Sequence, residues 1–516
     1  MVGWGVLQDP RYPNIPGTVN LGENTAGADG SSKEANWDYV EPKKRGEIVL
    51  NPQPSESPND PLNWTTATKM AILLILALTA GVTVSLGPMI TTGSEDVATA
   101  FGVTTDQVSF NIVGIMQLTT GSGTFFTAAA AAVWGKRPVF IVSTIGLLFH
   151  VAFHHASCSR FLCFSLETLV SATVSEIFFV HEKGKMLSVW NLFVMGGVKL
   201  GQLIASFIIQ SLGFKFTFGI CACIYAMIIP AMYFFVPETL YIPQTDPPTQ
   251  LIVDKTEGRV YEIVLPDMKK SLKERLSIFN GRISQASFWA LAAKPIPLVT
   301  FPAVIFSAFT YSFYAAGLTL IALLQDTIFS APPYNLSTSA IGLTNLPLFG
   351  VGLVGTLVSG YCADFVVQWM TRHNNGIYEP EFRLVLMFVA ASLSTVAYIG
   401  FGYSVAAGAS IYIPIAFLGV QTFAVPFATS SMFTYVMDCH NRLAPQAFVT
   451  MNFIKAILSL VMSDFVNGWF EASGAKSVFT TVAIANLAVS AFAIPMYIFG
   501  KRLRSKVARS AFHQKF

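Results

Sequence analysis

The sequence predicts an all-α polytopic membrane protein with twelve transmembrane helices arranged as two bundles of six. Composition is the first observation: 53% of the 516 residues are hydrophobic and only 12% are charged, about half the charged share of a soluble domain. The second observation is the alternation of long apolar segments with short polar ones. The third is that Lys and Arg gather in alternate connecting loops.

The elements follow from the length of the apolar segments, because a transmembrane helix needs about 20 mostly apolar residues to cross a core roughly 30 Å thick. Six such segments lie near residues 68–91, 107–132, 138–156, 161–180, 186–210 and 214–236. Six more lie near 297–325, 338–362, 384–404, 409–437, 446–470 and 477–500. The chain therefore divides into a polar N-terminal region (1–66), a bundle (67–236), a central loop (237–296), a second bundle (297–500) and a basic tail (501–516).

The loop charges orient these helices. The predicted inner loops hold Lys136, Arg137, Lys183, Lys185, Arg372, Arg383 and Arg442, whereas the predicted outer loops hold only Arg160, Lys215 and Lys476. The positive-inside rule then places both termini in the cytoplasm. The sequon at Asn335 falls in an outer loop, so we expect glycosylation there; an unused sequon is the alternative.

Several functional classes lack support in the sequence. The net charge is +3 and no basic stretch follows a helix face, so we expect no nucleic-acid partner. The six Cys residues show no metal-ligand spacing, and we expect neither a metal nor a cofactor. There is no phosphate-binding loop and no catalytic motif, so we expect neither ATP-driven transport nor an enzyme.

A set of short motifs resembles the major facilitator superfamily, and within it the fungal twelve-helix drug:proton antiporter branch. The likeness covers about residues 47 to 507. The motifs that carry it are Asn59-Asp60-Pro61-Leu62-Asn63-Trp64, Gly135-Lys136-Arg137-Pro138, the run from Phe178 to Lys185, Pro237-Glu238-Thr239, the run from Ser330 to Asn335, the run from Asn374 to Arg383, Tyr435-Val436-Met437-Asp438 and Phe465-Val466-Asn467-Gly468-Trp469.

The resemblance implies a secondary transporter that moves a small organic solute by alternating access, as proton-coupled efflux. Drugs, secondary metabolites or polyamine-like compounds are the implied substrates. We expect a monomer in the plasma membrane, with a vacuolar or other endomembrane as the alternative.

Three features depart from the family pattern. An acidic residue is missing before Gly135, and the expected Gly-Pro is missing near Gly196 in the fifth segment. The fourth segment is about a dozen residues short between Arg160 and Glu167. That third departure leaves open an altered gene model, or a transporter-like sensor or non-transporting relative.

Two lysines are predicted deep in the membrane. Lys199 lies 14 positions after Lys185, and Lys455 lies 13 after Arg442, which places both about 20 Å in. Buried charges usually face a polar cavity or a partner, and the fold binds solutes between its halves. We therefore expect both lysines to bind substrate; snorkelling or pairing with a neighbouring helix is the alternative. Glu167 is the expected partner of Lys199 and the proton-coupling candidate.

Other polar residues are predicted to line the cavity or form gates. The lining candidates are Gln117, Asn111, Gln202, Asn345, Gln421 and Tyr435, and ordinary interhelical hydrogen bonding is the alternative for each. The gating candidates are Lys136, Arg137, Asp364, Arg372 and Asp438, with Arg383 and Arg442 beside them. Simple surface charges are the alternative for this group.

Overall fold

The computed structural model describes residues 5–7, 17–20, 44–45, 48–49, 54–55, 57–156, 166–241, 249–253, 260–264, 271–440 and 443–509. Arg160 and Arg442 lie outside the described residues, and so does the side chain of Glu167.

The N-terminal half is built from apolar runs separated by capping residues. Thr65 caps the first helix by accepting a hydrogen bond from the Thr68 amide. Gly213, at φ 90°, separates the last two helices of this half. The elements are η1 (Pro61–Asn63), α1 (Thr66–Ser85), α2 (Pro88–Thr91), α3 (Ser94–Phe101), α4 (Thr105–Val108), the π-helical turn η2 (Ser109–Gly114), α5 (Ile115–Trp134), α6 (Lys136–Ala156), α7 (Glu167–Ile177), α8 (Val180–Leu212) and α9 (Phe214–Phe235).

The C-terminal half follows a connecting segment that contains α10 (Leu272–Leu276), α11 (Phe288–Ala293) and η3 (Ile296–Thr300). Its first long helix begins at Pro302 rather than near 297, because 296–300 form the 3-10 helix and proline favours a helix start. The elements are α12 (Pro302–Ser330), α13 (Thr338–Leu343), α14 (Asn345–Arg372), η4 (Pro380–Leu384), α15 (Val385–Ala406), α16 (Tyr412–Cys439), α17 (Ala444–Ala491) and α18 (Ala493–Ala508).

The long element α17 contains two passes. Gly474 has non-helical torsion angles, φ 72° and ψ 165°. Before it, Asn467 donates a hydrogen bond to Ser109 in η2. After it the chain returns, and Arg504 in α18 pairs with Glu381 in η4. The glycine therefore reverses the chain between the two predicted final helices.

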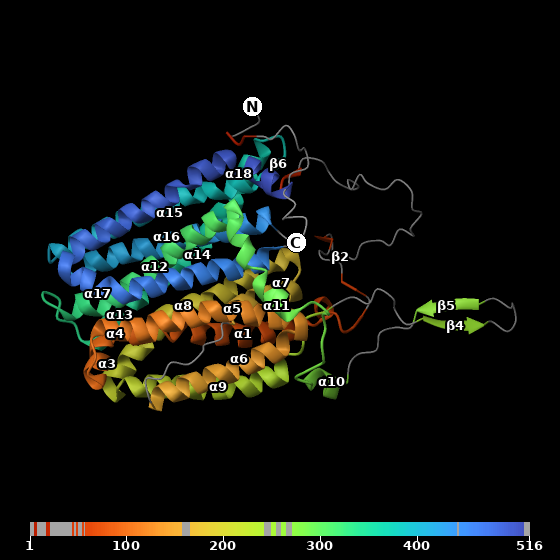
Figure 1. The fold of residues 1–516 in the computed structure, drawn as a ribbon, viewed down its shortest axis with the longest axis horizontal. Helices are drawn as coiled ribbons and strands as arrows, with labels where there is room; N and C mark the ends of the chain where they lie inside the picture. Colours follow the sequence, from red (N-terminus) through yellow and green to blue (C-terminus); the bar gives the residue numbers. More distant parts are fainter. Residues whose placement is uncertain are drawn as a thin grey trace.

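Short strands lie beyond the helices. They form three two-stranded antiparallel sheets: β1 (Val19–Asn20) with β6 (Ile377–Tyr378), β2 (Lys44–Arg45) with β3 (Ile48–Val49), and β4 (Thr249–Val253) with β5 (Val260–Val264). We call the end of the molecule that holds β6, α10 and the β4–β5 hairpin the terminal end. The end that holds α3 and α13 is the opposite end (Figure 1).

Two groups of long helices lie side by side in Figure 1, with α1, α5, α6, α8 and α9 in one and α12 and α14 to α17 in the other. Each group has its own apolar core, made of residues of its own half. A third cluster, which contains Leu320 and Val466, also includes Val113 of the N-terminal half. The halves are thus separate packing units that share an apolar contact.

Eight helical stretches of the described chain are long and apolar enough to cross a membrane: Thr66–Thr91, Val189–Leu212, Phe214–Phe235, Pro302–Ser330, Thr338–Arg372, Pro380–Ala406, Tyr412–Cys439 and Ala444–Ala508. The last stretch holds the two passes joined at Gly474. The second and third predicted segments are present as α5 and α6 but fall outside this set. The count of twelve stays a prediction.

The fourth predicted segment, 161–180, is described only in part, because residues 161–165 lie outside the described residues. Its described helix, α7, runs from Glu167 to Ile177, 11 residues. Phe178 then has extended torsion angles, which end the helix, and α8 begins at Val180. At 1.5 Å per residue α7 is about 16 Å long, roughly half the depth of a hydrocarbon core.

Candidate functional site

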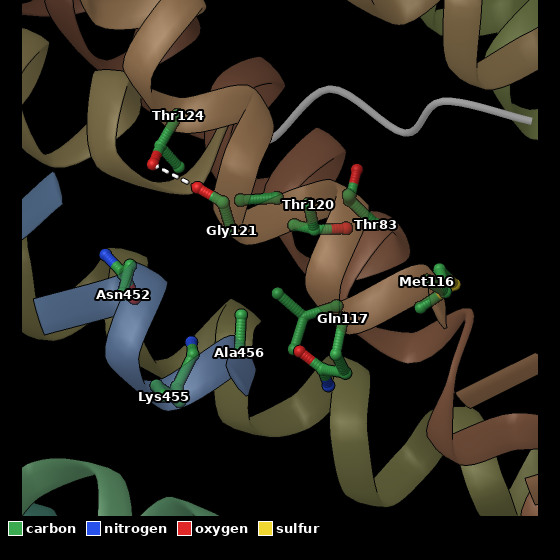
Figure 2. Close-up of a pocket in the computed structure, with 11 residues that line it drawn as sticks. Thr83, Met116, Gln117, Thr120, Gly121, Thr124, Asn452, Lys455 and Ala456 are labelled. Carbon is green, nitrogen blue, oxygen red and sulfur yellow. Dashed lines mark hydrogen bonds between the residues drawn. The ribbon is translucent and has the colours of Figure 1, made fainter. Parts of the chain in front are cut away.

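A small cavity lies between the two halves. Its volume is about 70 Å³, and it is lined by Ala80, Thr83, Val84, Met116, Gln117, Thr120, Gly121, Thr124, Asn452, Lys455 and Ala456. The first three belong to α1, the next five to α5 and the last three to α17. Figure 2 shows the α17 side chains across the space from those of α5. Both halves therefore contribute walls to one space.

The walls combine apolar side chains with several polar groups, although the helices are apolar overall. α5 supplies the amide of Gln117 and the hydroxyl groups of Thr120 and Thr124, and α17 supplies the amide of Asn452. The Thr124 hydroxyl donates to the Gly121 carbonyl at 2.6 Å. These groups interrupt the apolar run of α5, because a cavity-facing helix needs polar side chains where a lipid-facing one does not.

Lys455 is the one cationic residue among the described residues that line the cavity, and none of these residues is acidic. Its ammonium lies 5.6 Å from the centroid of the Tyr311 ring, within the range of a cation–π interaction. Tyr311 is on α12, so the C-terminal half holds the ammonium in place. The arrangement places one ammonium and several hydrogen-bonding groups on the cavity wall.

Lys199 lies elsewhere on the interface between the halves. Its side chain is buried, and its ammonium donates to the Asn345 side-chain oxygen at 3.3 Å. Lys199 belongs to α8 and Asn345 to α14, so this hydrogen bond joins the halves. The structure therefore brings Lys455 and Gln117 to the cavity but places Lys199 in a separate interhelical contact. Its predicted role in binding remains untested.

The other predicted lining residues do not reach the cavity. The Gln421 amide donates to the Tyr398 hydroxyl at 3.0 Å within the C-terminal half. Asn111 donates to the Gln107 carbonyl at 2.8 Å in the π-helical turn, and Gln202 donates to Thr91 at 3.1 Å. Tyr435 is fully buried in the core of the C-terminal half. Their predicted contact with substrate stays a prediction. Glu167 is the first residue of α7.

A carboxylate organises the terminal end of the N-terminal half. Glu238 accepts hydrogen bonds from the backbone amides of Lys136 and Arg137, at 3.0 and 3.1 Å, where the start of α6 leaves amides without helical partners. The Arg137 guanidinium donates to the carbonyl of Tyr233 at 2.7 Å. The Lys136 ammonium pairs with Glu176 at 2.7 Å. Burial lowers the pKa of Lys136, and Glu176 opposes that shift.

A second charged cluster organises the terminal end of the C-terminal half. Arg504 pairs with Glu381 at 2.7 Å and with Glu379 at 3.2 Å, and Lys501 also pairs with Glu379. All four side chains are buried. We predicted no role for these four residues from the sequence, although acidic residues in one loop and basic residues after the last apolar segment were a signal for pairing.

The predicted gating residues of this half divide into two groups. Asp438 pairs with Arg383 at 3.1 Å and accepts a hydrogen bond from Tyr378. Asp364 and Arg372 are exposed, and neither forms an ion pair with any residue that the structure describes. The geometry therefore gives Asp438 a fixed partner, whereas Asp364 and Arg372 have no ion-pair partner in the part of the chain that the structure describes. Whether any of the three gates transport is untested.

Residues near the beginning of the chain pack against the terminal end of the C-terminal half, beside the ion cluster of Glu379, Glu381, Lys501 and Arg504. Val6 is buried with Met370, Tyr378 and Phe382, and the Leu7 amide donates to the Ile498 carbonyl. Further along, the Thr18 hydroxyl donates to Glu379 at 2.8 Å. This N-terminal arm, residues 5–7 and 17–20, therefore covers the ion cluster.

The opposite end joins the halves by hydrogen bonds. The backbone amide and the hydroxyl of Ser94 donate to Asp326, at 3.0 and 2.9 Å. The Ser339 amide donates to Gln210 at 2.8 Å. The predicted glycosylation residue Asn335 is exposed at this end, as an acceptor must be, and its modification stays a prediction.

Two helical halves around a shared polar cavity are the architecture of a membrane transporter. The chain belongs to the Major Facilitator Superfamily, whose sequence model matches residues 70–463. It is an integral membrane protein, and its relatives place it among membrane transporters.

Similar proteins come largely from fungi. The chain is 25% identical to Protein HOL1 of Saccharomyces cerevisiae, across 96% of each chain. It is 25% identical to an uncharacterised MFS-type transporter of Schizosaccharomyces pombe, across 90% of each. It is 22% identical to the efflux pump radE of Floropilus chiversii, across 87% of this chain and 84% of that one.

Solved structures share the fold. The human organic anion transporter MFSD10 (TETRAN) has a TM-score of 0.53 and 15% identity, across 82% of this chain and 99% of that one. A bacterial homologue of the human lysosomal transporter Spinster, in an inward-facing and unoccupied conformation, has a TM-score of 0.53 and 12% identity, across 86% and 99%. At these identities the likeness shows the fold alone.

Proposed function

We propose that the chain exports a small anionic or oxygen-rich organic solute in exchange for protons, by alternating access of the cavity between its halves. The observation that carries the proposal is the lining: the ammonium of Lys455, two amides and three threonines, with no acidic residue among the described lining residues. A cationic ammonium and neutral donors favour carboxylate, hydroxyl or carbonyl oxygens. A polyamine would meet the charge of Lys455, and none of the described lining residues would supply a compensating anion.

The size of the cavity supports a moving carrier. A volume of about 70 Å³ is well below the roughly 300 Å³ at which ligand pockets begin. An organic solute therefore fits only after the halves separate. Because each half has its own core, such a rigid-body motion leaves the apolar packing within each half intact.

Orientation and coupling complete the proposal. We assign the terminal end to the cytoplasm, because the basic loops Lys136–Arg137 and Arg372 lie there, following the positive-inside rule. Efflux is supported by the similarity to the radE pump. Glu167 is our candidate for the carboxylate that carries the proton, because it is an acidic residue within the predicted bundle.

Inside-out membrane vesicles with an acidic interior test the proposal. Organic acids, neutral hydroxylated compounds, a polyamine and a lipophilic cation would be offered in turn, with and without an ionophore that collapses the pH gradient. We expect gradient-dependent uptake of acids or hydroxylated compounds. Lys455→Met removes a charged hydrogen-bond donor, so it should lower that uptake about tenfold.

Lys476→Met is the matched control, because Lys476 also lies over a tyrosine, Tyr403, at 4.8 Å, but it is exposed and is not among the residues that line the cavity. Its uptake should stay within about twofold of the original chain, since exposed charges contribute little. Uptake of the polyamine in preference to every acid, or unchanged acid uptake by Lys455→Met, would overturn the assignment of substrate class.

A transporter-like sensor is the second candidate, favoured by the short helix α7. The described part of this segment, 11 residues, is by itself too short to cross the membrane. Binding of a solute to the purified protein, without any gradient-dependent uptake of that solute by vesicles, would select this candidate.

A further inference from the structure

Asp326 crosses from one half of the molecule to the other at the opposite end. It lies near the C-terminus of α12, and one of its carboxylate oxygens, Oδ2, accepts two hydrogen bonds from Ser94. Ser94 is the first residue of α3, in the N-terminal half. The first amides of a helix have no partner within it, so a carboxylate of the C-terminal half completes the hydrogen bonding of a helix of the N-terminal half.

The surroundings of this contact are closed. Asp326 is 4% exposed and Ser94 is 6% exposed. No Lys, Arg or His of the described chain pairs with Asp326, and the charged neighbour that acts on it is Glu95, which has the same sign. The two hydrogen bonds from Ser94, with the backbone amide of Glu95 beside them, therefore replace water around a buried carboxylate.

We propose that the Asp326–Ser94 contact is a latch that holds the two halves together at the opposite end of the molecule, where the outer gate of the cavity lies. The contact is broken each time the cavity opens to that side. α3 contributes Val97 and Ala98 to the core of the N-terminal half, and α12 contributes Val304 and Tyr311 to the core of the C-terminal half. What the contact stabilises is the approach of the halves. Breaking it without opening leaves a buried carboxylate unsatisfied, so the gate has two discrete positions.

The latch rests on the alternating access of the proposed function, but its test needs no solute. Val113, which is 3% exposed and packs among residues of the C-terminal half, becomes accessible when the halves part. Val113→Cys would be labelled on intact cells with a membrane-impermeant maleimide, and site-resolved mass spectrometry would quantify the label at position 113 beside the six native cysteines.

We expect Asp326→Ala to increase the labelling rate on the order of tenfold, because two hydrogen bonds to a carboxylate are lost. Ser94→Ala removes only the hydroxyl donor and should give a smaller increase. In the Asp326→Ala background Ser94→Ala should add nothing, because the two residues act as one unit. Glu471→Ala, which removes an exposed carboxylate after the Asn467 contact, should label like the parent.

Labelling of Asp326→Ala at the parent rate, or full additivity of the two substitutions, would show that the contact is not a latch. Gel filtration of each variant separates opening from unfolding, and Ser94→Ala keeps the test available if Asp326→Ala does not fold. Because labelling proceeds without substrate, a working latch with no measurable flux would leave the sensor candidate standing and the latch confirmed.

Discussion

Gly135 occupies a position that only glycine tolerates, between α5 and α6. Its φ is +95°, which is costly for a residue with a side chain. A Cβ placed there would lie 2.3 Å from Glu238 Oε2, the carboxylate that holds the start of α6. We therefore expect Gly135→Ala to lower the free energy of unfolding by about 1–2 kcal/mol from backbone strain alone, and by more because Glu238 must move.

Thermal unfolding in detergent measures this change, and Gly213→Ala provides the comparison. Gly213 also has a positive φ, +90°, but nothing lies within 4 Å of a Cβ placed there. Both variants therefore have the same backbone strain, but only Gly135→Ala brings a Cβ against Glu238. Equal losses for the two variants would mean that the approach to Glu238 contributes nothing.

At the scale of single residues, the sequence predicted which charged residues form contacts better than it predicted their partners. Lys136, Arg137 and Asp438 were selected from their loops, and each has an ion pair or hydrogen bond in the structure. Glu238 was recognised only as part of a motif, because its partners are backbone amides about a hundred positions earlier. Depth along a helix placed Lys199 and Lys455 near the interface, but it contains no information about which helix each faces.

The ion cluster at the terminal end links two elements, because Lys501 and Arg504 of α18 pair with Glu379 and Glu381 at the start of η4. Arg504 is buried between Glu379 and Glu381. Among the described residues, Arg504→Met would leave Glu379 paired with Lys501 and Glu381 without an ion-pair partner. Removal of one partner from a buried ion pair costs about 3–5 kcal/mol. We expect the variant to accumulate poorly and to unfold at a lower temperature in detergent, as read by fluorescence-detected gel filtration.

Arg502→Met is its control, since Arg502 is a neighbouring arginine on the same helix but is exposed. It should behave like the parent. If both variants lost stability equally, the effect would come from α18 itself and not from the buried carboxylates.

Helices were predictable wherever an apolar run was long and bounded by polar residues. α9, α15 and α16 each lie within a few residues of their predicted bounds. The end of the fourth segment was not predictable, because a continuous apolar composition gives no sign of the extended torsion angles at Phe178. α14 extends to Arg372, ten residues beyond expectation, since a helix can continue past the membrane into water.

The two halves meet closely along α5 and α17, where small residues allow the approach. A Cβ placed on Gly121 would lie 2.4 Å from the Ala456 Cβ, beside the cavity. Gly121→Leu would hold the halves apart, and overpacking of this kind costs about 1–3 kcal/mol. We expect vesicle uptake to fall about tenfold while the thermal stability of each half's core changes little.

Gly360→Leu is the comparison, because nothing lies within 4 Å of a Cβ at that position of α14. It should leave uptake unchanged. A Gly121→Leu variant with normal uptake would show that the close approach of α5 and α17 is not needed for transport.

At the scale of the whole molecule, six segments, a polar loop and six more segments were enough to predict two bundles. The contacts between the bundles were beyond the sequence. Ser94 and Asp326 are 232 positions apart, and each is unremarkable in its own segment.

The charge of Lys455 has a consequence for how a membrane voltage would act on the carrier. An empty cavity carries the positive charge of the ammonium, whereas a bound anion cancels it. One elementary charge moved through the field is worth about 2.3 kcal/mol per 100 mV. In the proposed exchange, the return step carries a proton and the ammonium without a bound anion, so voltage would change the speed of that step more than that of the solute-loaded step. Polarisation of the cell would then set turnover without altering which solute is chosen.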